Sequence, residues 1–128
     1  MKKYLVLLII SVGLILIFRI SQEKPIPVFS EIIRQMGYDD VSETPYEVVE
    51  FTIPSEFNDV WENYNILQKE NGYDLGLYKG KKCKRYTYLI PAKNARANII
   101  VCEGKIIGGD ISSITIDGIM KPLEKRNK

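Results

Sequence analysis

The stretch Lys82–Asp117, KCKRYTYLIPAKNARANIIVCEGKIIGGDISSITID, contains three segments rich in β-branched and aromatic residues. Two short turn sequences separate them, residues 91–94 (PAKN) and residues 103–104 (EG), because proline, asparagine and glycine favour turn conformations. Sequential strands joined by short loops pair as an antiparallel meander. The stretch therefore predicts three paired strands, at Lys82–Ile90, Arg96–Cys102 and Lys105–Asp117.

The first turn also predicts a register for the two cysteines of the chain. If residues 91–94 form a four-residue hairpin loop, Ile90 pairs with Ala95 and Cys83 lies opposite Cys102. An oxidising compartment would then permit a disulfide between them. A slip of one residue would ruin this geometry, so a disulfide and two free thiols both remain open. Two thiols cannot supply the four ligands of a structural zinc site, and no metal site is predicted.

The third segment contains Gly108-Gly109-Asp110, which resembles the start of the signature of enzymes that make cyclic dinucleotides. Such an enzyme needs a larger α/β domain, metal-binding carboxylates on two elements and an acidic residue after the motif. Here Ile111 and Ser112 follow instead. A glycine pair inside a strand is typical of a bulge or of a close approach by a helix. We therefore predict a structural bulge or helix contact at these glycines, with Asp110 hydrogen-bonded in the bend or solvated.

One further strand and two helices are predicted before this stretch. Residues 28–37 show apolar residues at helical spacing and predict a short helix that ends at Gly37. Tyr46–Pro54 alternates between apolar and polar residues, as a half-buried strand does. A longer amphipathic helix is predicted between an N-cap at Ser55 and Gly72. Its apolar stripe consists of Phe57, Val60, Trp61, Tyr64 and Leu67.

These elements predict an α+β fold. An antiparallel sheet, made of one strand plus the three-strand meander, carries the long amphipathic helix on one face, with Trp61 in the core. The chain has 128 residues, enough for one small domain. We assign this domain to residues 28–120, followed by a polar tail at residues 121–128.

The N-terminal residues MKKYLVLLIISVGLILIFRI predict a membrane anchor. Two lysines precede an apolar run at residues 4–20, whose length is at the short end of the roughly 17–25 residues that a spanning helix needs. A cleaved signal peptide is the alternative, although no small-x-small cleavage pattern follows the run. We predict a single-pass transmembrane helix with a cytoplasmic N-terminus, a linker at residues 21–27 and an extracytoplasmic domain.

Composition excludes several classes of protein. The net charge is +2, and it is nearly balanced beyond residue 20, which argues against nucleic-acid binding. The chain has no histidine, the commonest general base and metal ligand, so we predict a non-enzymatic protein without a cofactor. Paired carboxylates are the remaining route to catalysis, as in a carboxylate-based cell-wall hydrolase. The candidate pairs are Asp39 with Asp40, Glu47 with Glu50, and Asp110 with Asp117.

Five basic residues lie within seven positions: Lys79, Lys81, Lys82, Lys84 and Arg85. They predict either a binding site for an anionic cell-wall polymer, a lipid headgroup or an acidic partner, or an edge strand protected by lysine against pairing with another sheet. The same region is rich in aromatic residues, which form either a ligand platform or a core face. These are Trp61, Tyr64, Tyr73, Tyr78, Tyr86 and Tyr88.

Four motifs together resemble an uncharacterised Firmicute family of small membrane-anchored envelope proteins, a domain of unknown function numbered forty-eight thirty. The resemblance covers most of residues 28–120 and implies an N-terminal anchor before the domain. It implies no catalytic or binding residue, because the family has no established activity. The motifs are IPSEFNDVWENYNILQKENGYDL (53–75), YKGKKCKRYTY (78–88), RANIIVCEGKIIGGDIS (96–112) and the pair Asp117-Gly118.

The sequence therefore favours a membrane-anchored extracytoplasmic module that binds an envelope protein, a peptide or a cell-wall polymer without catalysis. A cell-wall hydrolase is one alternative. A regulatory subunit of another membrane protein is the other.

Overall fold

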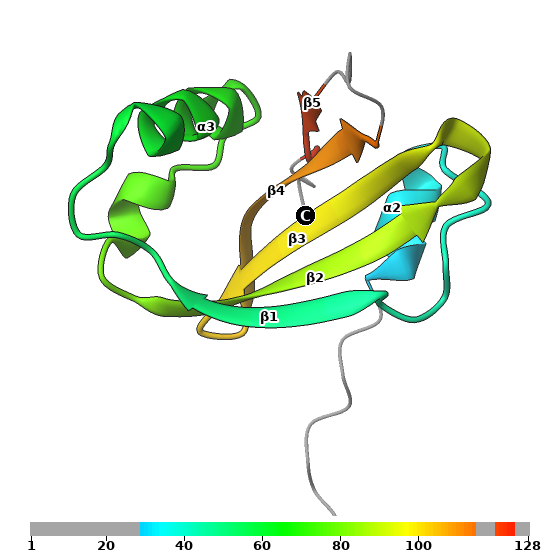
Figure 1. Ribbon diagram of the computed structural model, residues 1–128, viewed down its shortest axis with the longest axis horizontal. Coiled ribbons are helices and arrows are strands. Elements are labelled where there is room, and N and C mark those ends of the chain that lie inside the picture. Colours follow the sequence, from blue (N-terminus) through cyan, green and yellow to red (C-terminus); the bar gives the residue numbers. More distant parts are fainter. Residues whose placement is uncertain (1–28, 115–119, 125–128) are drawn as a thin grey trace, which may run out of the picture.

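The computed structural model describes residues 29–114 and 120–124. They form an α+β fold with a five-stranded antiparallel sheet (Figure 1), which confirms the predicted fold class. The elements are α2 (Ser30–Gln35), β1 (Glu47–Thr52), α3 (Asp59–Glu70), the 3₁₀ helix η1 (Leu75–Tyr78), β2 (Lys82–Ile90), the 3₁₀ helix η2 (Pro91–Lys93), β3 (Ala95–Cys102), β4 (Lys105–Ser113) and β5 (Met120–Pro122).

The strands follow one another across the sheet in chain order, β1-β2-β3-β4-β5, so the predicted meander is correct. Ile90 pairs with Ala95 across the first hairpin, as expected from the four-residue loop. The second hairpin pairs Cys102 with Lys105 around a two-residue turn. β2 lies between β1 and β3, so the interpretation of its lysines as protection of a sheet edge is wrong.

The C-terminal part of the domain departs from the prediction. Residues 120–122 form a fifth strand against β4, and the Leu123 N–H donates to the Gly109 carbonyl oxygen at 3.1 Å. Leu123 is fully buried. The prediction of a polar tail is therefore wrong for residues 121–124. These residues belong to the domain because β4 offers a free strand edge for pairing and because the Leu123 side chain is buried.

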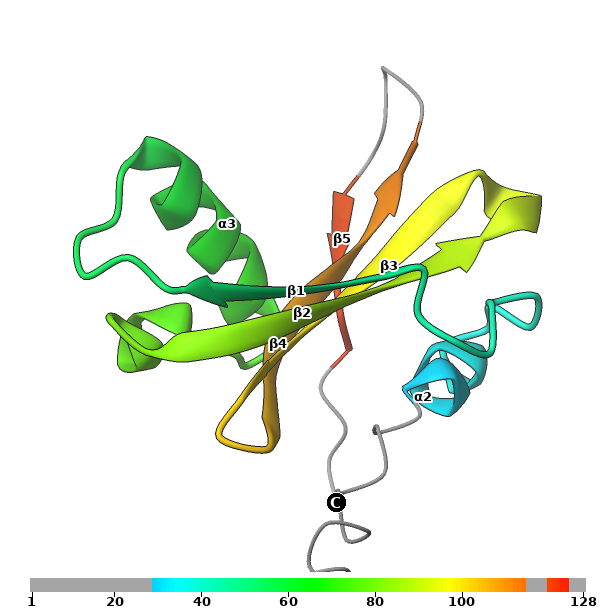
Figure 2. The same cartoon turned by 60° about the horizontal axis from the view of Figure 1, so that its bottom comes forward.

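The two helices lie on opposite sides of the strongly twisted sheet, as Figures 1 and 2 show. Side chains alternate between the faces along a strand. On β2, Tyr86 and Tyr88 belong to the cluster that contains Ile33 of α2, whereas Cys83 belongs to the cluster beside Trp61 of α3. The sequence predicted both helices but not their separation by the sheet.

The face under α2 is an apolar core. Phe29 packs edge-on against Tyr86, with ring centroids 5.1 Å apart. The buried residues of this face are Phe29, Ile33, Val41, Tyr86, Tyr88, Ile90, Ala95, Ala97, Ile99, Ile111 and Leu123. A core of this kind supplies most of the hydrophobic stabilisation of a small domain.

Helix α3 is shorter than predicted. Its N-cap is Asn58, whose side chain accepts the Trp61 N–H at 3.0 Å, and Ser55 lies outside the helix. The predicted end at Gly72 is correct, since the Gly72 and Tyr73 N–H groups donate back to Lys69 and Gln68 carbonyl oxygens, the pattern of a Schellman cap.

The apolar stripe predicted for α3 is only partly correct. Val60 is 75% exposed, while the buried residues of the helix are Asn65 and Gln68. Both are engaged by buried backbone groups: Gln68 accepts the Gly109 N–H of β4, and Asn65 accepts the Leu75 N–H of η1. Hydrophobic periodicity cannot identify a contact of this kind, because it counts amides as solvent-facing.

The predicted anchor at residues 1–20 and the linker at residues 21–27 lie outside the described residues, as does Asp117. Among the residues that the structure describes, no helix is long and apolar enough to cross a membrane.

Candidate binding groove between α3 and the sheet

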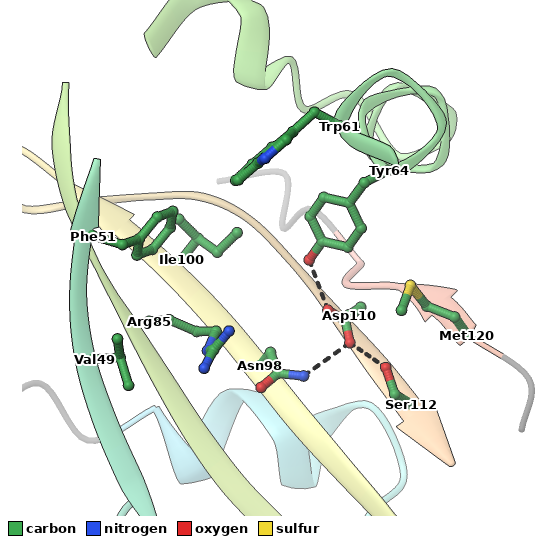
Figure 3. Close-up of a pocket in the computed structure, with 10 residues that line it drawn as sticks. All are labelled: Val49, Phe51, Trp61, Tyr64, Arg85, Asn98, Ile100, Asp110, Ser112 and Met120. Atoms are coloured by element: carbon green, nitrogen blue, oxygen red, sulfur yellow. Dashed lines mark hydrogen bonds between the residues drawn. The ribbon is translucent and has the colours of Figure 1, made fainter. Parts of the chain in front are cut away.

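A groove of about 380 Å³ lies between α3 and the sheet (Figure 3). Helix α3 contributes Trp61 and Tyr64 to one wall, and β1 forms the opposite wall. The floor comes from β2, β3 and β4, and β5 supplies Met120 at the rim. The lining residues are Val49, Phe51, Trp61, Tyr64, Arg85, Asn98, Ile100, Asp110, Ser112 and Met120.

One end of the groove is aromatic. The Trp61 ring stacks on Phe51 with centroids 6.3 Å apart, and on Phe57 with centroids 5.7 Å apart. Tyr64 meets Trp61 edge-on. The Lys79 ammonium lies 4.5 Å from the centre of the Phe57 ring. These partly exposed rings present a flat apolar surface on which an aromatic or apolar ligand group can pack.

Polar contacts fix α3 against β4 and η1 beside the groove. The Gly109 N–H donates to Gln68 Oε1 at 2.9 Å, and the Leu75 N–H donates to Asn65 Oδ1 at 2.7 Å. A Cβ atom at Gly108 would lie 2.8 Å from Gln68 Oε1, so the absence of a side chain lets the helix approach. Gly108 therefore makes the helix contact that its sequence context indicated.

The glycine pair also adjoins an irregularity in the sheet. The β3–β4 register shifts between Ile100 and Val101, which pair with Gly108 and Ile106, so Ile107 is the additional residue. Gly109 has a φ of +156°, and a Cβ there would overlap the Asn98 carbonyl oxygen. The bulge thus begins one residue before the predicted position.

A hydrogen-bond network centred on Asp110 forms part of the floor (Figure 3). The buried carboxylate accepts hydrogen bonds from the Tyr64 hydroxyl at 2.7 Å, the Asn98 amide at 3.0 Å and the Ser112 hydroxyl. Asn98 Oδ1 in turn accepts from the Thr87 hydroxyl at 2.7 Å. Of the two outcomes considered for Asp110, solvation or hydrogen bonding, the structure shows the second.

The network joins α3 to the sheet through Tyr64. Burial, followed by the charge of Asp110 and its hydrogen bond, raises the pKa of Tyr64 well above its usual range. The phenol therefore stays protonated and donates to the carboxylate. The assembly works as a structural bridge, because both Asp110 oxygens are already occupied by donors.

A second hollow, of about 360 Å³, continues from the groove along the same face. The two share Arg85, Asn98 and Ser112, so they form one continuous depression with an aromatic end and a polar end. The other residues that line the second hollow are Glu47, Thr87, Arg96, Ser113 and Ile114.

Arg85 stands where the two hollows meet. It is exposed, and its side chain lies over the floor between Val49 and Asn98 in Figure 3. Within residues 29–114 and 120–124 it forms no ion pair. A guanidinium carries five N–H donors in a planar fork, so Arg85 offers an anion-binding group beside the aromatic wall.

The other basic residues near Arg85 do not join it. Lys81 pairs with Glu103 at 2.8 Å, and Lys82 lies 3.7 Å from Glu50. Lys84 lies two residues from Tyr86 on β2, so by strand alternation its side chain points to the α2 face as that of Tyr86 does. Only Arg85 of the five predicted anion-binding residues lines the groove, while Lys79 lies on the Phe57 ring beside it.

Among the described residues, no candidate carboxylate pair meets in the groove. Glu47 and Glu50 lie on opposite faces of β1 by alternation, and Glu50 contacts Lys82. Asp40 accepts the Ala92 N–H at 2.6 Å, which fixes it in a turn. The partner proposed for Asp110 lies outside the described residues. No group of three or more potential metal ligands occurs among the described residues.

Sequence reasoning singled out Trp61, Tyr64, Arg85 and Asp110 separately, but not as one site. It missed Asn98 and Ser112. A signal did exist, because polar residues at alternate positions of central strands must have partners when buried. The two-residue turn alone would place Asn98 opposite Gly109, and the bulge at Ile107 moves it opposite Asp110.

Comparison with known proteins places the chain in a family without assigning an activity. No curated protein and no solved structure matches it. The sequence model described as "Domain of unknown function (DUF4830)" matches residues 33–111, more than half of the chain. The matched region runs from α2 to β4 and so contains most of the groove. The chain therefore belongs to the DUF4830 family, whose function is unknown.

Proposed function

We propose that the domain is a non-enzymatic binding module, held at the outer face of the membrane by residues 4–20, that binds a segment of a partner protein in the α3 groove. The observation that carries this proposal is the Arg85 guanidinium next to the aromatic wall of Trp61 and Phe51, where no described residue forms an ion pair with it. This combination suits a peptide that presents an apolar or aromatic side chain close to a carboxylate.

The charges of the region favour a peptide over an anionic cell-wall polymer. A repeating polyanion is bound best by several unpaired cations along one path. Here Lys81 and Lys82 are paired with glutamates, and Lys84 lies on the other face. Among the described lining residues of the groove, Arg85 is the basic one, and Arg96 lies farther along in the second hollow, over the Tyr46 ring. A guanidinium in the groove that can grip one carboxylate in bidentate fashion matches one acidic group on a mostly apolar ligand.

The geometry gives less support to a hydrolase. A catalytic carboxyl group must exchange a proton with its substrate, but Asp110 is buried and accepts hydrogen bonds from Tyr64, Asn98 and Ser112. Glu47 lines the second hollow and not the first. Among the described residues, the groove thus holds one fully engaged carboxylate, which suits a rigid support for binding.

The proposal is tested by site-specific photo-crosslinking in living cells. A photoreactive amino acid replaces Met120 at the groove rim or, as a matched control, Leu77, which is 73% exposed and lines neither hollow. We expect a discrete protein adduct from position 120 and none from position 77. Arg85→Glu in the same chain should abolish the adduct, whereas Lys84→Glu should leave it, because only Arg85 lines the groove.

The outcomes separate the alternatives. Adducts that sediment with the cell wall and contain no second protein would show that the ligand is a cell-wall polymer and not a peptide. Equal adducts from positions 77 and 120, or an adduct that survives Arg85→Glu, would contradict recognition through the groove.

A further inference from the structure

The strand register places the two cysteines side by side. The Ile53 N–H donates to the Lys81 carbonyl oxygen, so the odd-numbered residues of β2 direct their backbone groups to β1 and the even-numbered residues direct theirs to β3. Lys84 pairs with Val101, and the next pair in this register is Cys83 with Cys102. This pair is non-hydrogen-bonded, the type in which Cα atoms and side chains come closest.

Both side chains point to the α3 face and both are buried, each with 2% of its surface exposed. The structure shows them as free thiols. The Cys83 thiol lies 3.7 Å from the Lys81 carbonyl oxygen, and the Cys102 thiol lies 3.6 Å from the Lys82 carbonyl oxygen. In a non-hydrogen-bonded antiparallel pair the Cα atoms are about 4.5 Å apart, which lies at the lower end of the range of about 4.4–6.8 Å that disulfides span.

We propose that Cys83 and Cys102 form a covalent cross-strand disulfide, which closes when the chain folds in the presence of a disulfide oxidant. The thiolate of one cysteine attacks a sulfur of the oxidant, R–S–S–R, and expels one R–S⁻ to give a mixed disulfide. The second cysteine thiolate then attacks the protein sulfur of that bond and expels the other R–S⁻. The two protein thiols lose two electrons and two protons, and the oxidant is reduced to two thiols.

We expect the disulfide to form during folding, because the two thiols of the folded, reduced protein are protected from reaction with the oxidant. Burial, followed by hydrogen bonding and charge interaction with Cys102, raises the pKa of Cys83 to about 12. Since only the thiolate attacks a disulfide, and both sulfurs are inaccessible, the folded dithiol should exchange slowly. The unfolded or partly folded chain has accessible thiols with ordinary pKa values.

The bond would affect the base of the aromatic wall. Cys83 lies opposite Phe51 in the β1–β2 pairing, and both cysteines belong to the cluster against which Phe57 and Trp61 pack. A bond there would tie β2 to β3 beneath these rings. This inference goes beyond the proposed function and does not depend on it, because it concerns the two strands and not the ligand.

The test compares the full-length chain refolded under oxidising conditions with the same chain refolded under reducing conditions. Unfolded, reduced protein is refolded with oxidised glutathione or with a reducing agent, and a parallel sample of folded dithiol protein receives oxidised glutathione. Mass spectrometry and thiol-specific alkylation after denaturation report the product. Cys102→Ser serves as the control, because it can form only a glutathione adduct or a disulfide between two chains.

We expect refolding with oxidised glutathione to yield monomer that has lost two hydrogen atoms and both free thiols. Its melting temperature should exceed that of the reduced protein by on the order of 10 °C. The folded sample should react many times more slowly. The proposal is overturned if refolding leaves both thiols free, if only glutathione adducts form, or if the oxidised monomer melts at or below the temperature of the dithiol form.

Discussion

The two faces of the sheet are built in different ways. The α2 face is closed by apolar side chains, with Ile33 and Tyr88 fully buried. The α3 face also has an apolar cluster, on which Trp61 packs, but hydrogen bonds of Gln68 and Tyr64 connect its helix to the sheet, and it leaves a groove open.

The difference shows how a small domain can combine stability with a binding surface. Apolar contacts are non-directional and favour close packing, as in the cluster of buried side chains under α2. Hydrogen bonds are directional and fix the helix at a few points while space remains between them. We therefore expect substitutions on the α2 face to act on stability, and substitutions in the groove to act mainly on binding.

The largest effect is expected on the α2 face. Ile33→Ala removes a fully buried side chain from the core and should lower the free energy of unfolding by about 3 kcal/mol. Urea denaturation followed by fluorescence measures the change. Gln35→Ala, at an exposed position of the same helix, is the control and should change stability by less than about 0.5 kcal/mol. Equal losses for the two variants would show that α2 does not depend on its core contacts.

The contact of α3 with the sheet should be the next most sensitive. Gln68→Met keeps the approximate size of the side chain but leaves the buried Gly109 N–H without its acceptor. We expect a loss of about 2 kcal/mol, because an unsatisfied buried donor is costly. The exposed neighbour Lys69→Met is the matched control. The attachment would be apolar instead if Gln68→Met were as stable as the unsubstituted chain.

A smaller effect, dependent on pH, is expected at Tyr64. Tyr64→Phe removes one hydrogen bond to Asp110 and should cost about 1 kcal/mol at pH 7. Folding raises the pKa of Tyr64, so above about pH 10 the unfolded state binds fewer protons and stability falls as the pH rises. The variant should lose stability less steeply in that range, although burial also raises the pKa values of Tyr73 and Tyr88.

Denaturation curves between pH 8 and 11, at about unit intervals, measure both slopes. Parallel curves for the two proteins would mean that Tyr64 ionises as readily in the folded state as in the unfolded state.

The smallest effect on stability is expected in the groove itself. Arg85 has no ion pair within the described ranges, so Arg85→Gln should change the free energy of unfolding by no more than about 0.5 kcal/mol. The same substitution should remove the crosslinked partner. A loss of stability comparable to that of Gln68→Met would show that Arg85 is a structural residue. It would contradict the expectation that substitutions in the groove act mainly on binding.

Local patterns explain which parts of the fold were predictable. Pro91 and Asn94 are the first and last residues of a four-residue loop. The length of this loop determined the β2–β3 register, and the register places Cys83 opposite Cys102. The helix end at Gly72 was predictable because it depends on backbone conformation within one turn. The N-cap was misplaced, since Ser55 and Asn58 are both acceptable caps and only the packing of the chain selects between them.

The sequence by itself determined the first four strands, the hairpin order of the meander and the existence of two helices, because these depend on contacts between near neighbours. Only the tertiary structure decided that the helices cover opposite faces, that Leu123 completes the α2 core, and that Asn65 and Gln68 are the buried residues of α3. The groove also belongs to this second group. It exists because residues far apart in the chain, Tyr64 and Asp110, hold a helix against the sheet without filling the space beside Arg85.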